Sequence, residues 1–137
     1  MTATAPAPAS EDLSGLWHGQ FDYPNHQPPT PFVATLLDQE GAVSGAITEN
    51  STLPPRVGEP LYAVVRGRRS GLAVSFRKSY ETDDPRYQVV NYEGRVSSDG
   101  TEIEGSWRTG GWQGRFLMIR GASREVTVES EVRATVQ

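Results

Sequence analysis

Residues 86–120 read RYQVVNYEGRVSSDGTEIEGSWRTGGWQGRFLMIR. Apolar and polar side chains alternate along most of this segment, which is the pattern of half-buried β-strands. Ser98-Asp99-Gly100 and Thr109-Gly110-Gly111 interrupt the alternation, and each supplies glycine for the positive φ that a tight hairpin turn needs. The segment therefore predicts three consecutive antiparallel strands joined by short turns.

The same alternation continues upstream, and a helical spacing of apolar residues is nowhere sustained. The chain has 137 residues with 14 Gly and 10 Pro, which favours one domain of many short strands over a helical fold. A meander without a helix to cover its edges is best stabilised when the sheet closes on itself. We predict an all-β, eight-stranded antiparallel up-and-down β-barrel with strands Gly15–Tyr23, Phe32–Asp38, Ala42–Glu49, Leu61–Arg68, Leu72–Tyr80, Arg86–Val96, Thr101–Arg108 and Trp112–Arg120.

The two ends of the chain differ in composition from the predicted barrel. The start, MTATAPAPAS, is typical of an extended disordered tail and lacks the basic and apolar regions of a secretory signal. Residues 123–137 mix valines with Glu, Thr and Arg, which fits a ninth strand or a tail. We predict a disordered tail over 1–12, the barrel domain over 13–121, and a C-terminal strand or tail over 122–137.

Charge and residue types narrow the possible partners. The formal net charge of −4 argues against nucleic acid, whose binding proteins normally present a basic face. The chain has no cysteine and only His18 and His26 as imidazole ligands, so we expect no metal site and no cofactor. Because no apolar stretch approaches the roughly 20 residues of a membrane helix, we expect no membrane partner and a cytoplasmic location.

Alternation also gives the side chains that face the barrel interior. Strands 32–38 and 61–68 are apolar on both faces, which leaves their inward face open and suggests that a second copy covers the outside, as a homo-oligomer. In the other strands the predicted inward residues are Trp17, Gly19, Phe21 and Tyr23; Val43, Gly45, Ile47 and Glu49; Val74, Phe76, Lys78 and Tyr80; Val90, Tyr92, Gly94 and Val96; Ile103, Gly105 and Trp107; and Trp112, Gly114, Phe116 and Met118.

Aromatic residues gather at one end of the predicted barrel. Three short turns meet at one end, which we call the short-turn end, and the Pro-rich connections 24–31, 50–60 and 81–85 meet at the other, the long-loop end. Aromatic rings where an apolar surface meets a polar partner are typical of a binding site, and an eight-stranded barrel can hold one small ligand. Seven of the twelve aromatic residues fall at the long-loop end: Tyr23, Phe32, Tyr62, Tyr80, Tyr87, Trp107 and Trp112.

Charged and hydroxyl groups extend the same inward faces. Lys78 and Glu49 lie one strand apart near the long-loop end, where they should pair, contact a ligand or reach water at the rim. Because alternation places Lys78 just inside this end, we predict that Lys78→Met is tolerated or even stabilising in the empty protein and weakens the binding of an anionic ligand by about 1.5–3 kcal/mol. Tyrosines there serve either as hydrogen-bond donors to a ligand or as plain core residues. The predicted ligand-binding set is Tyr23, Glu49, Tyr62, Lys78, Tyr80, Tyr92, Trp107 and Trp112, with Trp107 as a rim residue whose removal leaves the barrel folded.

Gly15-Leu16-Trp17 opens the first predicted strand, and Arg120 ends the last. In this the chain resembles the calycin barrels, the lipocalins and the avidin-like proteins. The resemblance implies that Trp17 closes the barrel base and that Arg120 packs on its ring as a structural plug, through a cation–π contact. The short meander and the tryptophans at 107 and 112 are more similar to the avidin-like branch. The chain departs from both branches, since no lipocalin-type helix follows the last strand and no polar set matches the avidin ligand site, so biotin is not carried over.

Three functions remain open. The first is a non-enzymatic carrier or sensor of a small aromatic or amphipathic molecule held at the long-loop end. The second is an isomerase or cyclase that uses Lys78, Glu49 or Tyr80 as acid or base. The third is a ligand-free barrel that binds other proteins through its apolar outer strands. A filled interior would exclude the first two, and an open cavity would weigh against the third.

Overall fold

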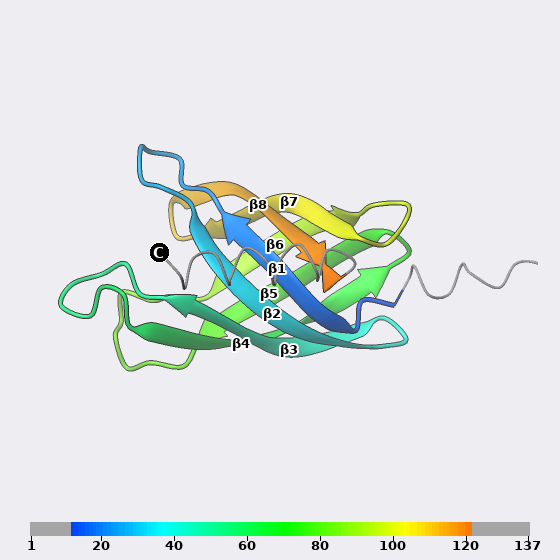
Figure 1. The fold of residues 1–137 in the computed structure, drawn as a ribbon, viewed down its shortest axis with the longest axis horizontal. Helices are drawn as coiled ribbons and strands as arrows, with labels where there is room; N and C mark the ends of the chain where they lie inside the picture. Colours follow the sequence, from blue (N-terminus) through cyan, green and yellow to red (C-terminus); the bar gives the residue numbers. More distant parts are fainter. Residues whose placement is uncertain (1–11, 122–137) are drawn as a thin grey trace, which may run out of the picture.

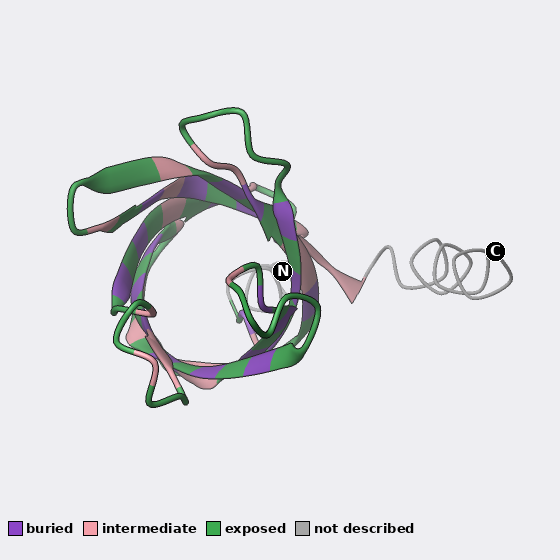
Figure 2. Ribbon diagram, turned by 90° about the vertical axis from the view of Figure 1, so that its left-hand side faces the viewer, coloured by how far each residue is buried: buried purple, intermediate pink, exposed green. Residues whose placement is uncertain are grey.

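The computed structural model describes residues 12–121, and these form one closed sheet of eight strands (Figure 1). Each strand pairs antiparallel with the next, and β1 pairs with β8 from Trp17–Arg120 to Phe21–Phe116. Viewed from the long-loop end, the strands form a ring (Figure 2). The predicted up-and-down barrel is confirmed. Its strands are β1 Gly15–Phe21, β2 Thr30–Gln39, β3 Ala42–Asn50, β4 Pro60–Ser70, β5 Ala73–Tyr80, β6 Val90–Val96, β7 Glu102–Thr109 and β8 Trp112–Arg120.

The predicted C-terminal strand or tail, and the predicted N-terminal tail except Asp12, lie outside the described residues. Within the described part of the chain, no helix is long and apolar enough to cross a membrane.

Three strands are shorter than predicted, β5 by Leu72 alone and two others by more. β1 ends at Phe21 rather than Tyr23, and β6 begins at Val90 rather than Arg86. The reason at β6 is a turn centred on Asp84, whose side chain accepts a hydrogen bond from the Arg86 backbone N–H at 3.0 Å. The Asp84 carbonyl accepts another from the N–H of Tyr87. These residues therefore belong to a loop over the long-loop end instead of a strand.

The inward faces of the strands follow the predicted alternation. On β2 the side chains of Phe32, Ala34 and Leu36 face the interior, which decides the inward face that the sequence left open for this strand. On β4 the side chains of Leu61, Ala63 and Val65 face the interior, so the apolar residues between them face outward. Coverage of this outer face by a second copy stays a prediction. The exposed apolar side chains include Leu16, Val33, Leu37, Tyr62, Val64 and Leu117.

Facing glycines let β6 and β7 approach closely and coil. Gly94 and Gly105 are direct register partners. A Cβ added to Gly105 would lie 1.9 Å from the carbonyl oxygen of Glu93, and one added to Gly94 would lie 2.9 Å from the Phe116 ring. The missing side chains leave room for large rings inside the barrel.

A buried tryptophan and an arginine close the short-turn end. Trp17 is fully buried, and the Arg120 guanidinium carbon lies 4.7 Å from the centre of its ring, so the predicted contact is present. Arg120 also donates hydrogen bonds to the backbone carbonyls of Gly100 at 2.9 Å, Ser14 at 3.1 Å and Asp12. One side chain of β8 thus ties the start of the barrel to the turn between β6 and β7.

Arg120→Ala should lower the free energy of unfolding by about 2–3 kcal/mol, because it removes charged hydrogen bonds and the stacking on Trp17. Urea denaturation measures the change. Arg115→Ala serves as the control, because that side chain is exposed and its distance to Glu104 is 3.9 Å; it should alter stability by no more than about 0.5 kcal/mol. Full stability in Arg120→Ala would contradict the structural role.

A second anchor at this end, not singled out by the sequence, is the buried carboxylate of Asp38. It accepts hydrogen bonds from Arg69 Nε at 2.6 Å and from the backbone N–H groups of Leu13 at 3.0 Å and Gly41 at 2.9 Å. Burial alone would raise the pKa of Asp38, but these hydrogen bonds and the Arg69 charge outweigh it and lower the pKa. Asp38 therefore holds the strand ends together in its ionised form.

Asp38→Asn should reduce stability at pH 7 by about 1.5–3 kcal/mol through the loss of charged hydrogen bonds. Since the folded-state pKa lies below the unfolded value of about 3.9, this stabilisation is present above pH 4 and is lost as the pH falls through the folded-state pKa. Urea titrations should show that the gap in the free energy of unfolding between wild type and variant is smaller near pH 2 than at pH 7. The exposed Asp83, changed to Asn, is the control at pH 7, and a gap that stays constant with pH would contradict this role.

Candidate functional site

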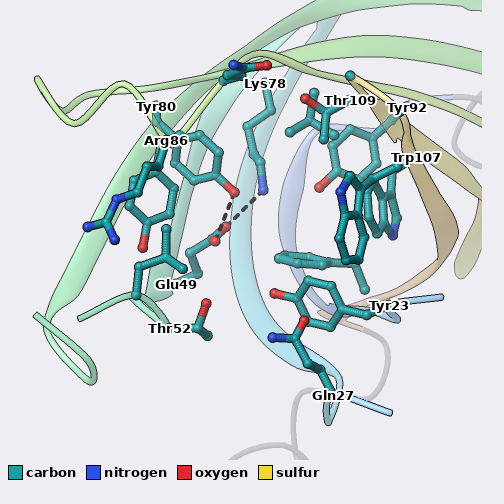
Figure 3. A pocket seen from close by; sticks show the side chains of 18 residues that line it. Tyr23, Gln27, Glu49, Thr52, Lys78, Tyr80, Arg86, Tyr92, Trp107 and Thr109 are labelled. Carbon is teal, nitrogen blue, oxygen red and sulfur yellow. Dashed lines mark hydrogen bonds and ion pairs between the residues drawn. The ribbon is translucent and has the colours of Figure 1, made fainter. Parts of the chain in front are cut away.

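The long-loop end opens into a cavity of about 580 Å³, a size suited to a small organic ligand (Figure 3). Its walls come from β1, β3 and β5 to β8, and the connections near residues 27, 52 and 87 overhang it. The lining residues are Phe21, Tyr23, Gln27, Glu49, Thr52, Leu53, Lys78, Tyr80, Arg86, Tyr87, Gln88, Val90, Tyr92, Trp107, Thr109, Gly110, Gly111 and Trp112.

One wall of the cavity is a packed aromatic group. Phe21 and Tyr23 meet edge to face, with ring centres 5.5 Å apart, and each ring centre lies 6.1 Å from that of Trp107. The Trp107 indole N–H donates to the Asp22 carbonyl at 2.9 Å. A Cβ on Gly114 would lie 2.7 Å from the same nitrogen, so this glycine makes room for the indole. Trp107 is only 4% exposed and belongs to the core as much as to the cavity.

The predicted rim position of Trp107 is therefore wrong. Trp112, which follows the Thr109-Gly110-Gly111 turn, is the tryptophan at the rim, with 48% of its surface exposed.

A buried ion pair also lines the cavity, next to Phe21. Lys78 Nζ lies 2.9 Å from Glu49 Oε1, and the Tyr80 hydroxyl donates to Glu49 Oε2 at 3.0 Å. Both charged side chains are almost completely buried. Of the three alternatives, pairing is the one that the structure shows, and the position in water at the rim is wrong. The long Lys78 side chain instead crosses the interior to its partner. Contact with a ligand stays a prediction.

Aromatic rings surround the ammonium group of this pair. Lys78 Nζ lies 4.6 Å from the centre of the Phe21 ring, 4.5 Å from that of Tyr80 and 5.5 Å from that of Tyr92. Burial lowers the pKa of Lys78, and the neighbouring Glu49 offsets part of that effect. Burial and the Glu49 charge raise the pKa of Tyr80 far above its usual value, so its hydroxyl stays protonated as a donor.

Tyr92 presents a rigid hydroxyl to the cavity. Its ring stacks on Phe76, with centres 4.8 Å apart and 11° between the planes, and Phe116 packs edge to face at 5.0 Å. The side chain is 1% exposed, and its hydroxyl points into the cavity (Figure 3). Within residues 12–121 this hydroxyl has no hydrogen-bond partner. Burial raises the pKa of Tyr92, so the group is a neutral phenol.

Loop contacts hold the cavity mouth in shape. The Tyr87 and Ser51 hydroxyl oxygens lie 2.6 Å apart, and the Tyr23 hydroxyl lies 2.8 Å from Thr30 Oγ1. Arg86 donates to Asp84 at 2.7 Å and to the Pro54 carbonyl at 2.8 Å, which joins the loops before β4 and β6.

Seven of the eight predicted site residues line this cavity. The exception is Tyr62, which is 54% exposed and points outward from β4, because its neighbours Leu61 and Ala63 occupy the interior. Phe32, expected at the same end, packs in the core against Phe21. The predicted set left out Phe21 and Val90, although alternation placed both on inward faces, and Tyr87, although that residue was placed at the correct end. The loop residues Gln27 and Thr52 carry no such signal.

No family model matches this sequence, and no curated protein matches it. The closed eight-stranded barrel agrees with the calycin resemblance at the level of architecture. Among residues 12–121, no group of three His, Cys, Asp or Glu side chains is placed to hold a metal ion.

Proposed function

We propose that this protein is a small-molecule-binding protein, a carrier or sensor, that holds an aromatic or amphipathic ligand in the cavity at the long-loop end. The observation that carries the proposal is the cavity itself: about 580 Å³, with one wall of packed aromatic rings. Apolar burial against these rings would supply most of the affinity, at about 25 cal/mol per Å². The hydroxyl groups of the lining would orient the ligand.

An enzymatic role for Lys78, Glu49 or Tyr80 is the second candidate, because a cavity lysine with a lowered pKa beside a carboxylate is common at catalytic sites. The hydrogen bonds weigh against it. Each Glu49 oxygen already accepts one hydrogen bond, from Lys78 Nζ or from the Tyr80 hydroxyl, so a substrate proton would have to compete with these donors. The cavity likewise weighs against a ligand-free interaction barrel.

Native mass spectrometry of the purified chain tests the proposal. We expect a non-covalent adduct of a few hundred daltons that disappears on denaturation, or that forms when aromatic compounds such as naphthalene or indole derivatives are added. Absence of both a co-purified and an added adduct would contradict a binding function. The same spectrum gives the number of subunits and so tests the predicted homo-oligomer.

A further inference from the structure

The Tyr92 hydroxyl is not needed for the packing of the barrel. Phe at this position would keep the stacking on Phe76, and no group among residues 12–121 forms a hydrogen bond with the hydroxyl, which leaves it available to a ligand. The clamped ring also fixes where the hydroxyl oxygen lies. A polar group held in this way is pre-organised for an atom of the ligand.

The neighbouring ammonium indicates which kind of atom fits. Lys78 Nζ carries three N–H donors and no acceptor, and Glu49 accepts one of them. In the part of the chain that the structure describes, no other group accepts a hydrogen bond from Nζ. The Tyr92 ring centre lies 5.5 Å from Nζ, with the hydroxyl directed into the same space (Figure 3). An acceptor with two lone pairs, such as a carbonyl oxygen, would suit both donors.

The charges of the cavity favour an uncharged ligand. Glu49 already neutralises Lys78 at 2.9 Å, and Asp84 neutralises Arg86 at 2.7 Å near the mouth. An anionic ligand would bring a second negative charge close to Glu49, where the low dielectric makes repulsion strong. A cation would face the same difficulty beside Lys78.

The walls favour a flat molecule. Trp107 and Tyr23 line one side, and Tyr80 lies on the other, across from them (Figure 3). Tyr80 is itself supported by Tyr87, with ring centres 5.0 Å apart. Aromatic walls on two sides suit a planar ring system, which can stack or meet them edge to face.

From the two donors, the neutralised charges and the aromatic walls of the cavity we propose that it selects a planar, uncharged aromatic carbonyl compound. The oxygen of this compound accepts hydrogen bonds from the Tyr92 hydroxyl and Lys78 Nζ. This inference rests on the proposed binding function and names the class of ligand.

Three matched probes test it: 2-acetylnaphthalene carries the carbonyl, 2-ethylnaphthalene has nearly the same shape without an acceptor, and 2-naphthoate carries a negative charge. Dissociation constants follow from quenching of tryptophan fluorescence in the full-length protein. We expect the ketone to bind at least about tenfold more tightly than the ethyl compound, because its oxygen accepts one hydrogen bond from a neutral donor and one from a charged donor, and more tightly than the carboxylate.

Tyr92→Phe is the diagnostic variant. It should lower the preference for the ketone by about two- to tenfold, the worth of the neutral hydrogen bond, while the Lys78 contribution and the affinity for 2-ethylnaphthalene remain, and its thermal unfolding temperature without ligand should be close to that of the wild type. Tyr62→Phe, which changes an exposed hydroxyl outside the cavity, should keep the preference.

The outcomes separate the two proposals. Equal binding of ketone and ethyl compound, tighter binding of the carboxylate, or a ketone preference that is undiminished in Tyr92→Phe would overturn the ligand class while leaving a binding protein. If none of the probes binds and no adduct is found by mass spectrometry, both proposals fail.

Discussion

Lys78→Met is expected to destabilise the barrel by about 3–5 kcal/mol, because it leaves the Glu49 carboxylate buried without its counter-ion. The Tyr80 hydroxyl would remain as a donor to Glu49 but cannot neutralise its charge. Guanidinium chloride denaturation at pH 7 measures the loss. This expected loss of stability is the opposite of the tolerance that the sequence predicted for a lysine just inside the mouth.

The matched control is Arg77→Met, one residue earlier on β5, where the side chain is exposed. It removes the same charge from the outer face and should change stability by no more than about 0.5 kcal/mol. The double variant Lys78→Met with Glu49→Leu should recover most of the loss, since replacing both members of a buried pair by apolar groups is often close to neutral. A single variant as stable as the wild type would show that the pair does not form in solution.

The Lys78–Glu49 pair also shows which features of the site can be predicted from the sequence alone. Alternation placed Lys78 and Glu49 inside the barrel, because each follows apolar residues at a spacing of two. Alternation could not show whether the two charged groups lie at the rim or deep in the interior of the barrel. Across β4, Glu49 lies opposite Leu61 and Lys78 opposite Val65, so the two residues are staggered along the strand between them. That stagger follows from the tilt of the closed barrel, which a single strand does not encode.

Tyr62 illustrates a different limit. On β4 both faces are apolar, and alternation alone permits either Tyr62 and Val64 or Leu61 and Ala63 to face inward. The register settles the choice: Leu61 pairs with Glu49 and Ala63 with Ile47, and paired residues share a face of the sheet. The register in turn depends on the loop before β4, whose ten or so residues carry no turn signature of fixed length. The plug at Trp17 could be predicted because it needed only the direction of two strands.

The two tryptophans of the cavity should separate stability from binding. Trp107→Ala is expected to lower the free energy of unfolding by about 3–5 kcal/mol, because it empties a packed core position and leaves the Asp22 carbonyl without its indole donor. Trp112→Ala should cost less than about 1 kcal/mol, since half of that side chain is already exposed. Guanidinium chloride titration of both variants checks this order.

Binding should follow a different order from stability. Trp112 lies at the mouth, where its ring would cover the outer part of a bound aromatic compound, so Trp112→Ala should weaken the binding of 2-acetylnaphthalene by about 1–2 kcal/mol, roughly five- to thirtyfold, in a barrel that stays folded. Titration of this variant, followed by quenching of the remaining tryptophans, measures the affinity. If Trp112→Ala binds as the wild type does, the ligand occupies only the deep part of the cavity beside Tyr92. If instead Trp107→Ala proves as stable as the wild type, the indole is not part of the core, and the aromatic wall of the cavity would have to be rebuilt from Phe21 and Tyr23 alone.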